Sequence, residues 1–181
     1  RMQYGLCDFD LRFFGLVDMG RTRTSNQDEI LLCPESGFFA VSDGMGGLRD
    51  GGKTSQMIKK VLPVMIQEAL VELTARKSIA FAEELLKERA ALLSDNIFET
   101  GNEGHAIEYG ATLCGAWLYG SQALIVNVGD SRAYRLDGRT GELSQISKDH
   151  NIAALLVESG DLTREEAKRH PTSCRVTRFM G

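Results

Sequence analysis

A long helical region between two strand-forming regions is the sequence feature that most constrains the fold. Apolar residues recur at three- and four-residue spacing in residues 57–73 and again in residues 79–97, as in helices that bury one face. Pro63 lies inside the first run, and we expect it to kink that helix. The glycine-containing residues 101–104 end the second run. The sequence therefore predicts two consecutive helices in the middle of the chain.

Strand patterns precede this helical region. Residues 13–19 alternate enough to predict a first strand, centred on residues 14–17. Residues 29–32 and 38–42 predict a hairpin, because a favourable turn sequence, Pro-Glu-Ser-Gly at 34–37, joins them. The chain is therefore expected to enter the helical region from a β-hairpin.

Strand patterns return after Gly110 as a meander, and two short helices follow it. The second short helix has a capping box, with Thr163 as the N-cap and Glu166 at the third helical position. Strands, then a helical pair, then strands favour an α+β layered domain over a parallel βαβ fold. The strands are expected at 111–119, 122–128, 131–136 and 143–146, and the short helices near 152–159 and 163–169.

Size, composition and charge limit the classes of protein to which the chain can belong. It has 181 residues, of which 43% are hydrophobic, enough for one domain or most of one. The net charge of −4 provides no basic field for nucleic acid. No apolar run approaches the ~20 residues of a membrane span, and no leader segment is visible. We expect a monomer without nucleic-acid or membrane partners.

Four cysteines are widely scattered and form no Cys-x-x-Cys pair. This spacing fits neither a zinc site nor a disulfide framework, and it indicates reduced thiols in a cytoplasmic protein. Cys33 and Cys114 lie in apolar runs and are expected to be buried in the core.

A single carboxylate, Asp43, follows directly after the second strand of the predicted hairpin and precedes Gly44, Met45, Gly46 and Gly47. Glycine lets the backbone approach closely, so the Asp43 side chain and the Gly44 carbonyl can both face one hard cation. Taken alone, an Asp-Gly pair after a strand is more often a hairpin turn. The neighbouring motifs favour the cation site.

These motifs occur in a recognisable order. Residues 23–28, Arg-Thr-Ser-Asn-Gln-Asp, precede the Asp43 turn, and Gly-Ala-Thr at 110–112, Val-Gly-Asp-Ser-Arg at 128–132 and Lys-Asp-His at 148–150 follow it. In this order they resemble the metal-dependent Ser/Thr protein phosphatases of the PP2C (PPM) family in their compact bacterial form. The resemblance covers the chain from about Phe14 to Gly181.

The resemblance implies an αββα sandwich, in which two packed antiparallel sheets carry helices on both outer faces and a metal site at one end. The family's catalytic domain continues beyond the point that corresponds to Gly181, and that later part supplies two further metal-binding aspartates. We therefore expect residues 1–181 to form a single, truncated PP2C-like domain without its C-terminal part. Asp95 precedes an asparagine but is expected to face solvent on a helix.

The resemblance also implies the metal ligands. Asp43 matches the bridging ligand, with the Gly44 carbonyl beside it, and Asp28 matches an acidic position that binds metal directly or through water. All-oxygen ligation suits two Mg²⁺ or Mn²⁺ ions, which can activate a shared water for attack on phosphorus. Asp130 matches a ligand of a third ion, although Asp130 and Arg132 could instead brace the turn by hydrogen bonds.

Arg23 matches the family's phosphate-binding arginine and would act in catalysis beside Asp43. A guanidinium can contact two phosphate oxygens at once, and the spacing to Asp28 favours Arg23 over Arg21. A solvated arginine is the alternative. Met45 departs from members that carry a histidine proposed as general acid.

We therefore expect a protein serine/threonine phosphatase that hydrolyses phosphoserine and phosphothreonine. Its partners would be phosphorylated proteins, the substrates of a Ser/Thr kinase. The alternatives are a non-catalytic pseudophosphatase and a regulatory module that binds phosphoproteins through Arg23 without turnover. Asp149 and His150 are expected to be structural.

Overall fold

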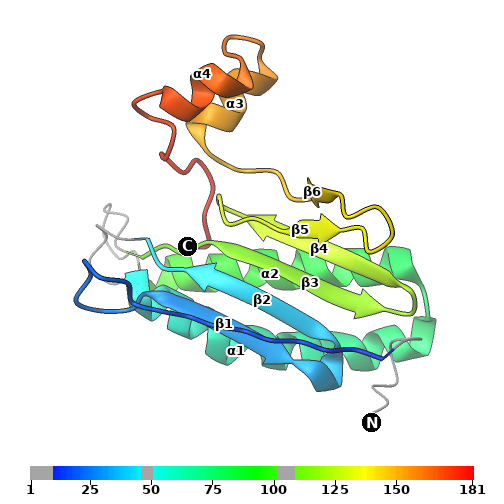
Figure 1. The fold of residues 1–181 in the computed structure, drawn as a ribbon. Helices are drawn as coiled ribbons and strands as arrows, with labels where there is room; N and C mark the ends of the chain where they lie inside the picture. The colour runs from blue at the N-terminus through cyan, green and yellow to red at the C-terminus, as the bar shows by residue number, and fades with distance from the viewer. Residues whose placement is uncertain (1–9, 46–50, 102–108) are drawn as a thin grey trace.

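The computed structural model describes residues 10–45, 51–101 and 109–181 of the chain. Its centre is an antiparallel sheet with the strand order β1-β2-β3-β4, and two long helices lie against one face of this sheet (Figure 1). Both helices were predicted from their periodicity. The elements are β1 (Asp28–Cys33), β2 (Phe38–Asp43), α1 (Gly51–Arg76), α2 (Ile79–Gly101), β3 (Leu113–Tyr119) and β4 (Gln122–Val128).

The β1–β2 hairpin confirms the predicted turn and fixes the register at the other end of the strands. Its connection is a short 3-10 helix, Pro34–Ser36, after which Gly37 takes the left-handed conformation at φ 67°. An added Cβ on Gly37 would lie 3.0 Å from the Leu118 carbonyl oxygen. The register that follows from this turn places Asp28 directly opposite Asp43.

The core lies between the four-stranded sheet and the two long helices. Leu31, Phe38, Ala40 and Trp117 point from the strands toward the helices and are buried. Burying a large apolar side chain of this kind contributes about 1.5–3 kcal/mol. The indole of Trp117 also donates a hydrogen bond of 2.9 Å to the carbonyl of Ser36. Helix α1 continues through Pro63.

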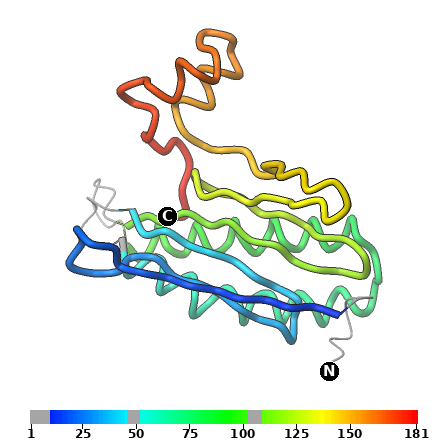
Figure 2. Tube along the Cα trace, in the orientation of Figure 1, coloured from blue at the N-terminus to red at the C-terminus, as the bar shows by residue number. Residues whose placement is uncertain are grey.

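The opposite face of the sheet is only partly covered. Leu32 and Val41 point to this face and are 43% and 44% exposed. The segment before β1 runs along the sheet (Figures 1 and 2), where the Phe13 ring lies 5.1 Å from that of Phe39.

The predicted strand at 13–19 is wrong, because this segment is not part of a sheet. Gly15 lies against the side chain of Ile30, while Phe14 is 85% exposed. The segment thus packs through side chains on the sheet face. Its alternating residues reflect that one side of the segment contacts the sheet and the other faces solvent, while its backbone forms no strand pairing with the sheet.

The chain leaves β4 for a smaller unit. β5 (Tyr134–Leu136) and β6 (Leu143–Gln145) form a separate two-stranded sheet, so the predicted meander is split. The strand expected at 131–136 begins only at Tyr134. Helices α3 (Ile152–Glu158) and α4 (Arg164–Arg169) follow.

The capping box of α4 is present as predicted. The Thr163 hydroxyl accepts from the Glu166 N–H, and the Glu166 carboxylate accepts from the Thr163 N–H. After α4 the chain returns to the main sheet, where Met180 and Ala111 exchange two backbone hydrogen bonds of 2.8 and 3.2 Å.

This architecture is the predicted α+β arrangement of antiparallel sheets and helices. In the described residues, one helical layer covers the main sheet, and α3 and α4 lie together away from it (Figure 1). The second helical layer implied by the resemblance is therefore not formed by the residues that the structure describes. None of the helices in these residues is both long and apolar enough to cross a membrane.

Candidate metal and phosphate site

The candidate site lies at the end of the main sheet where β1 begins and β2 ends. The side chains of Asp28 and Asp43, which are register partners, lie on the same face of the antiparallel pair. The Asp28 N–H is held by the side chain of Asn26 at 3.0 Å, and the Gly44 N–H donates to the Gln27 carbonyl at 3.0 Å. The start of β1 and the end of β2 are thus both held in place where the two carboxylates meet.

The electrostatics of Asp43 show that the predicted residues come together. Partial burial, the charge of Asp28, a hydrogen bond with Asp28 and the charge of Asp130 raise the pKa of Asp43 to about 6, while the charge of Arg23 lowers it. Partial burial is the largest cause of the raised pKa of Asp43, and the charge of Asp28 is the next. Two predicted carboxylates, Asp28 and Asp130, and the predicted Arg23 therefore all act on Asp43.

Arg23 lies at the exposed edge of this group. Its Nη1 is 3.4 Å from Oε1 of Gln27, and its charge acts on Asp43. Arg21 is also exposed, but it is not among the groups that shift the pKa of Asp43. The geometry thus agrees with the choice of Arg23 as the arginine nearer to the carboxylates.

The donor set fits a hard cation, although it is incomplete. Two carboxylates that face each other, one of them with a raised pKa, have the chemistry of a cation site. Among the residues that the structure describes, however, no group of three or more His, Cys, Asp or Glu side chains is close enough to hold one ion. Asp130 contributes charge to the Asp28–Asp43 pair and does not complete a three-carboxylate cluster.

The turn that carries Asp130 is held from two sides. On the inner side, the Thr112 hydroxyl lies 2.7 Å from the Ser131 hydroxyl and accepts from the Asp43 N–H at 3.0 Å. On the outer side, the Gly129 N–H donates to Nδ1 of His150 at 3.2 Å. Hydrogen bonds with Thr112 and His150 therefore hold the site in place, and the sequence motifs did not predict these bonds.

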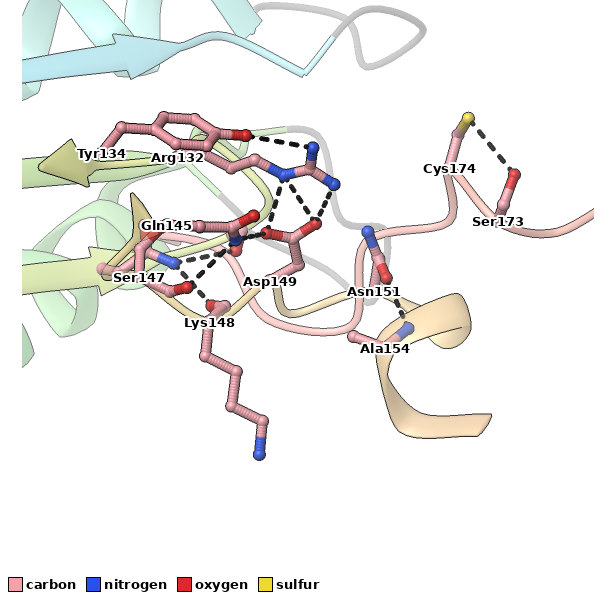
Figure 3. A network of polar contacts seen from close by, with 12 residues as sticks. Arg132, Tyr134, Gln145, Ser147, Lys148, Asp149, Asn151, Ala154, Ser173 and Cys174 are labelled. Carbon is pink, nitrogen blue, oxygen red and sulfur yellow. Dashed lines mark hydrogen bonds and ion pairs between the residues drawn. The ribbon is translucent and has the colours of Figure 1, made fainter. Parts of the chain in front are cut away.

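Arg132 braces this turn, but its partner is Asp149 and not Asp130. The guanidinium contacts both carboxylate oxygens of Asp149, with Nη2 at 2.6 Å and Nε at 2.9 and 3.0 Å (Figure 3). Gln145 donates to the same carboxylate at 2.8 Å. Arg132 thus braces the turn, as one of the two alternatives had it, and Asp149 has a structural role as its partner.

His150 has a structural environment as well. Burial, followed by the charges of Arg178 and Lys148, lowers the pKa of His150 below its ordinary value, and Asp149 opposes this. A neutral imidazole can accept the hydrogen bond from Gly129. His150 therefore supports the turn in its uncharged form.

The turn after Asp43 is only partly within the described residues. The Met45 N–H donates to the Gly110 carbonyl at 3.0 Å, whereas Gly46 and Gly47 lie outside the described residues.

The two cysteines that were expected in the core differ in burial. Cys114 is buried, as expected, but Cys33 is only partly buried.

Neither Thr112 nor Ser131 has a role that the sequence motifs assign. Thr112 is a polar residue that begins an apolar strand and is only 2% exposed. A buried hydroxyl nearly always has hydrogen-bond partners. A threonine at the start of an apolar run was therefore the one feature from which its role could have been predicted.

The sheet, the helical layer and the paired carboxylates define an α+β domain with a candidate cation-binding end. The chain belongs to the protein phosphatase 2C family, whose model matches residues 20–179.

Curated and solved relatives agree with this family. The serine/threonine phosphatase stp of Listeria welshimeri is 32% identical over 168 residues, which cover 91% of this chain and 65% of the relative. The crystal structure of a bacterial serine phosphatase superposes with a TM-score of 0.75 at 29% identity, covering 91% of this chain and 65% of that one. The PP2C-type fold is therefore confirmed.

A third relative carries metal. The catalytic domain of the serine/threonine protein phosphatase PstP, in complex with two manganese ions, matches with a TM-score of 0.59 at 27% identity, over 90% of this chain and 64% of that one. The chain spans slightly less than two thirds of the length of these three relatives.

Proposed function

We propose that the protein hydrolyses phosphoserine and phosphothreonine in other proteins, using water activated by divalent cations. The observation that carries the proposal is the meeting of Asp28 and Asp43 at the end of the sheet, with the charges of Asp130 and Arg23 acting on the same carboxylate. Membership of a family whose relatives are named serine/threonine phosphatases supports it.

The proposed cofactors are two Mg²⁺ or Mn²⁺ ions, with a third ion at Asp130. Asp28, Asp43 and the Gly44 carbonyl would hold the two ions, which suits all-oxygen ligation. When bound, the ions supply a water of lowered pKa as the nucleophile. The relative with two manganese ions supports this number.

The chain's own side chains supply binding and charge. Arg23 would contact two oxygens of the substrate phosphate, which orients the phosphorus and offsets developing charge. Asp43, with a pKa of about 6, is mostly ionised at neutral pH and so is ready to bind a cation. Met45 cannot transfer a proton, so the leaving alkoxide would take its proton from water.

The remaining parts of the proposal concern context. Residues 1–181 would belong to a single phosphatase domain of a monomeric, cytoplasmic protein. Its substrates would be proteins phosphorylated by a Ser/Thr kinase, as the names of the relatives suggest. Free cysteines at 33, 114 and 174 are compatible with a reducing compartment.

Release of inorganic phosphate from a phosphothreonine peptide by the full-length protein tests the proposal. We expect release with Mn²⁺, none with EDTA, and loss of turnover in Asp43→Asn. Asp95→Asn, which changes the same charge on the exposed face of α2, is the matched control and should retain activity. Peptide binding without phosphate release in the presence of Mn²⁺ would instead support the regulatory module.

A further inference from the structure

Thr112 connects two parts of the candidate site that are distant in sequence. It lies just before β3 and is almost completely buried. Its N–H donates to the Asp43 carbonyl at 2.8 Å, and its own carbonyl accepts from the Ser42 hydroxyl at 2.7 Å. These two bonds hold Thr112 against the end of β2.

The Thr112 hydroxyl makes two further contacts, one toward each turn. Its Oγ1 accepts from the Asp43 N–H at 3.0 Å and lies 2.7 Å from the Ser131 Oγ, in a bond for which either hydroxyl can be the donor. A hydroxyl that accepts one bond still has its own proton to donate, so both contacts form together. One side chain thus joins the Asp43 turn to the turn that contains Asp130.

The Thr112 methyl group contacts the same second turn. Gly129 has a φ of +106°, and a Cβ built on it would lie 2.6 Å from Cγ2 of Thr112. Because β3 lies between β2 and β4 in the sheet, the residue that leads into β3 lies between the end of β2 and the end of β4. Thr112 occupies that position with both branches of its side chain engaged.

We propose that Thr112 is a positioning residue whose hydroxyl sets the separation between Asp43 and the Asp130–Ser131 turn, and thereby the metal affinity of the site. This proposal rests on the proposed function. Thr112 acts through Asp43 and Ser131, since its hydroxyl is already shared between them.

Two substitutions separate the hydroxyl from the methyl group. Thr112→Val keeps the shape and removes the hydroxyl, so the Asp43 N–H and the Ser131 hydroxyl lose this partner. Thr112→Ser keeps the hydroxyl and removes the methyl that packs on Gly129. Thr74→Val is the matched control, because the Thr74 hydroxyl bonds within helix α1, to the Val71 carbonyl.

The experiment is a calorimetric titration of the full-length protein with Mn²⁺ alone, together with phosphopeptide kinetics at saturating Mn²⁺. Groups that orient metal ligands typically contribute tenfold to a hundredfold to metal affinity or activity. We expect Thr112→Val to weaken Mn²⁺ binding by about tenfold or more and to lower kcat, with the KM for phosphopeptide within about twofold of the parent. Thr112→Ser should stay within about threefold in Mn²⁺ affinity, and Thr74→Val should not change it.

Several results would overturn the proposal. Parent-like Mn²⁺ affinity in Thr112→Val would show that the hydroxyl does not position the site, and an equal loss in Thr112→Ser would assign the effect to packing. If Thr112→Val does not fold, Ser131→Ala removes one of the two hydroxyl contacts, and unchanged Mn²⁺ affinity there would also refute the role. A parent protein that neither binds Mn²⁺ nor hydrolyses phosphopeptide would refute the proposed function and this proposal together.

Discussion

Removing the charge of Asp43 should make the metal-free protein more stable at neutral pH, although it destroys the candidate cation site. Partial burial, followed by the charges of Asp28 and Asp130, raises the pKa of Asp43 from the ordinary 3.8 to about 6. The folded state therefore holds a proton on Asp43 more tightly than the unfolded state does. Ionising this carboxylate at neutral pH opposes folding, and Asp43→Asn removes that cost.

The magnitude follows from the same pKa difference. Without screening, a rise from 3.8 to about 6 corresponds to about 3 kcal/mol. Asp43 is exposed, so solvent screening reduces the expected gain to about 1 kcal/mol. For a chain of this length, that gain is a rise in Tm of about 2–4 °C.

The sign depends on pH in a defined way. Well below pH 3.8 Asp43 is protonated in both states and carries no cost, and the cost develops as pH rises from 3.8 to about 6. The advantage of Asp43→Asn should therefore be complete near pH 7.5 and small near pH 4. Thermal melts in EDTA at both pH values measure it, with Asp95→Asn as the control for net charge.

Adding Mn²⁺ should make the parent protein more stable than Asp43→Asn, the reverse of the order expected in EDTA. A ligand that binds only the folded state raises its stability, so the parent should gain more from Mn²⁺ than Asp43→Asn does. If Asp43→Asn is less stable than the parent at pH 7.5 in EDTA, the carboxylate contributes to the fold, and the argument from repulsion is wrong.

Three further predictions concern other parts of the molecule. Arg23→Ala should lower kcat/KM for phosphopeptide about tenfold to a hundredfold, because a charge-assisted hydrogen bond contributes about 1.5–3 kcal/mol; Arg23→Lys should recover only part of the loss, and a larger defect in Arg21→Ala would identify the other arginine. The 181-residue chain by itself should bind Mn²⁺ weakly and hydrolyse little phosphopeptide, which robust turnover would contradict. Asp149→Asn should cost about 1–3 kcal/mol in urea denaturation by weakening the contact with Arg132, whereas Glu165→Gln, at an exposed ion pair on α4, should cost less than about 1 kcal/mol.

The sequence predicted those helices and turns that are determined by interactions between residues close together in the chain. The Pro-Glu-Ser-Gly turn identified the β1–β2 hairpin, because Gly37 takes a φ of 67° that favours glycine. Thr163 and Glu166 identified the start of α4 through bonds within one turn. The periodicity of residues 57–97 identified α1 and α2, since one face of each is buried against the sheet.

Features that depend on distant partners were not predictable in the same way. The alternation at 13–19 describes which side chains meet the sheet, and it does not reveal whether the backbone finds a ladder. Thr112 bonds to residues 69 and 19 positions away in the chain, so no short motif contains the contact. A bracing role for Arg132 was one of two alternatives, but its partner, Asp149, lies 17 residues further on and could not be named from the turn itself.

The geometry of the candidate site depends on a turn at the far end of its strands. The turn at Pro34–Ser36 and Gly37 fixes the register of β1 with β2, which places Asp28 opposite Asp43. A slip by one residue would move a carboxylate to the other face of the sheet, toward the apolar core. Burial of Leu31 and Phe38 on the helix-facing side opposes the same slip. The residues that build the core thus also keep the two carboxylates together, on the face where a cation can reach them.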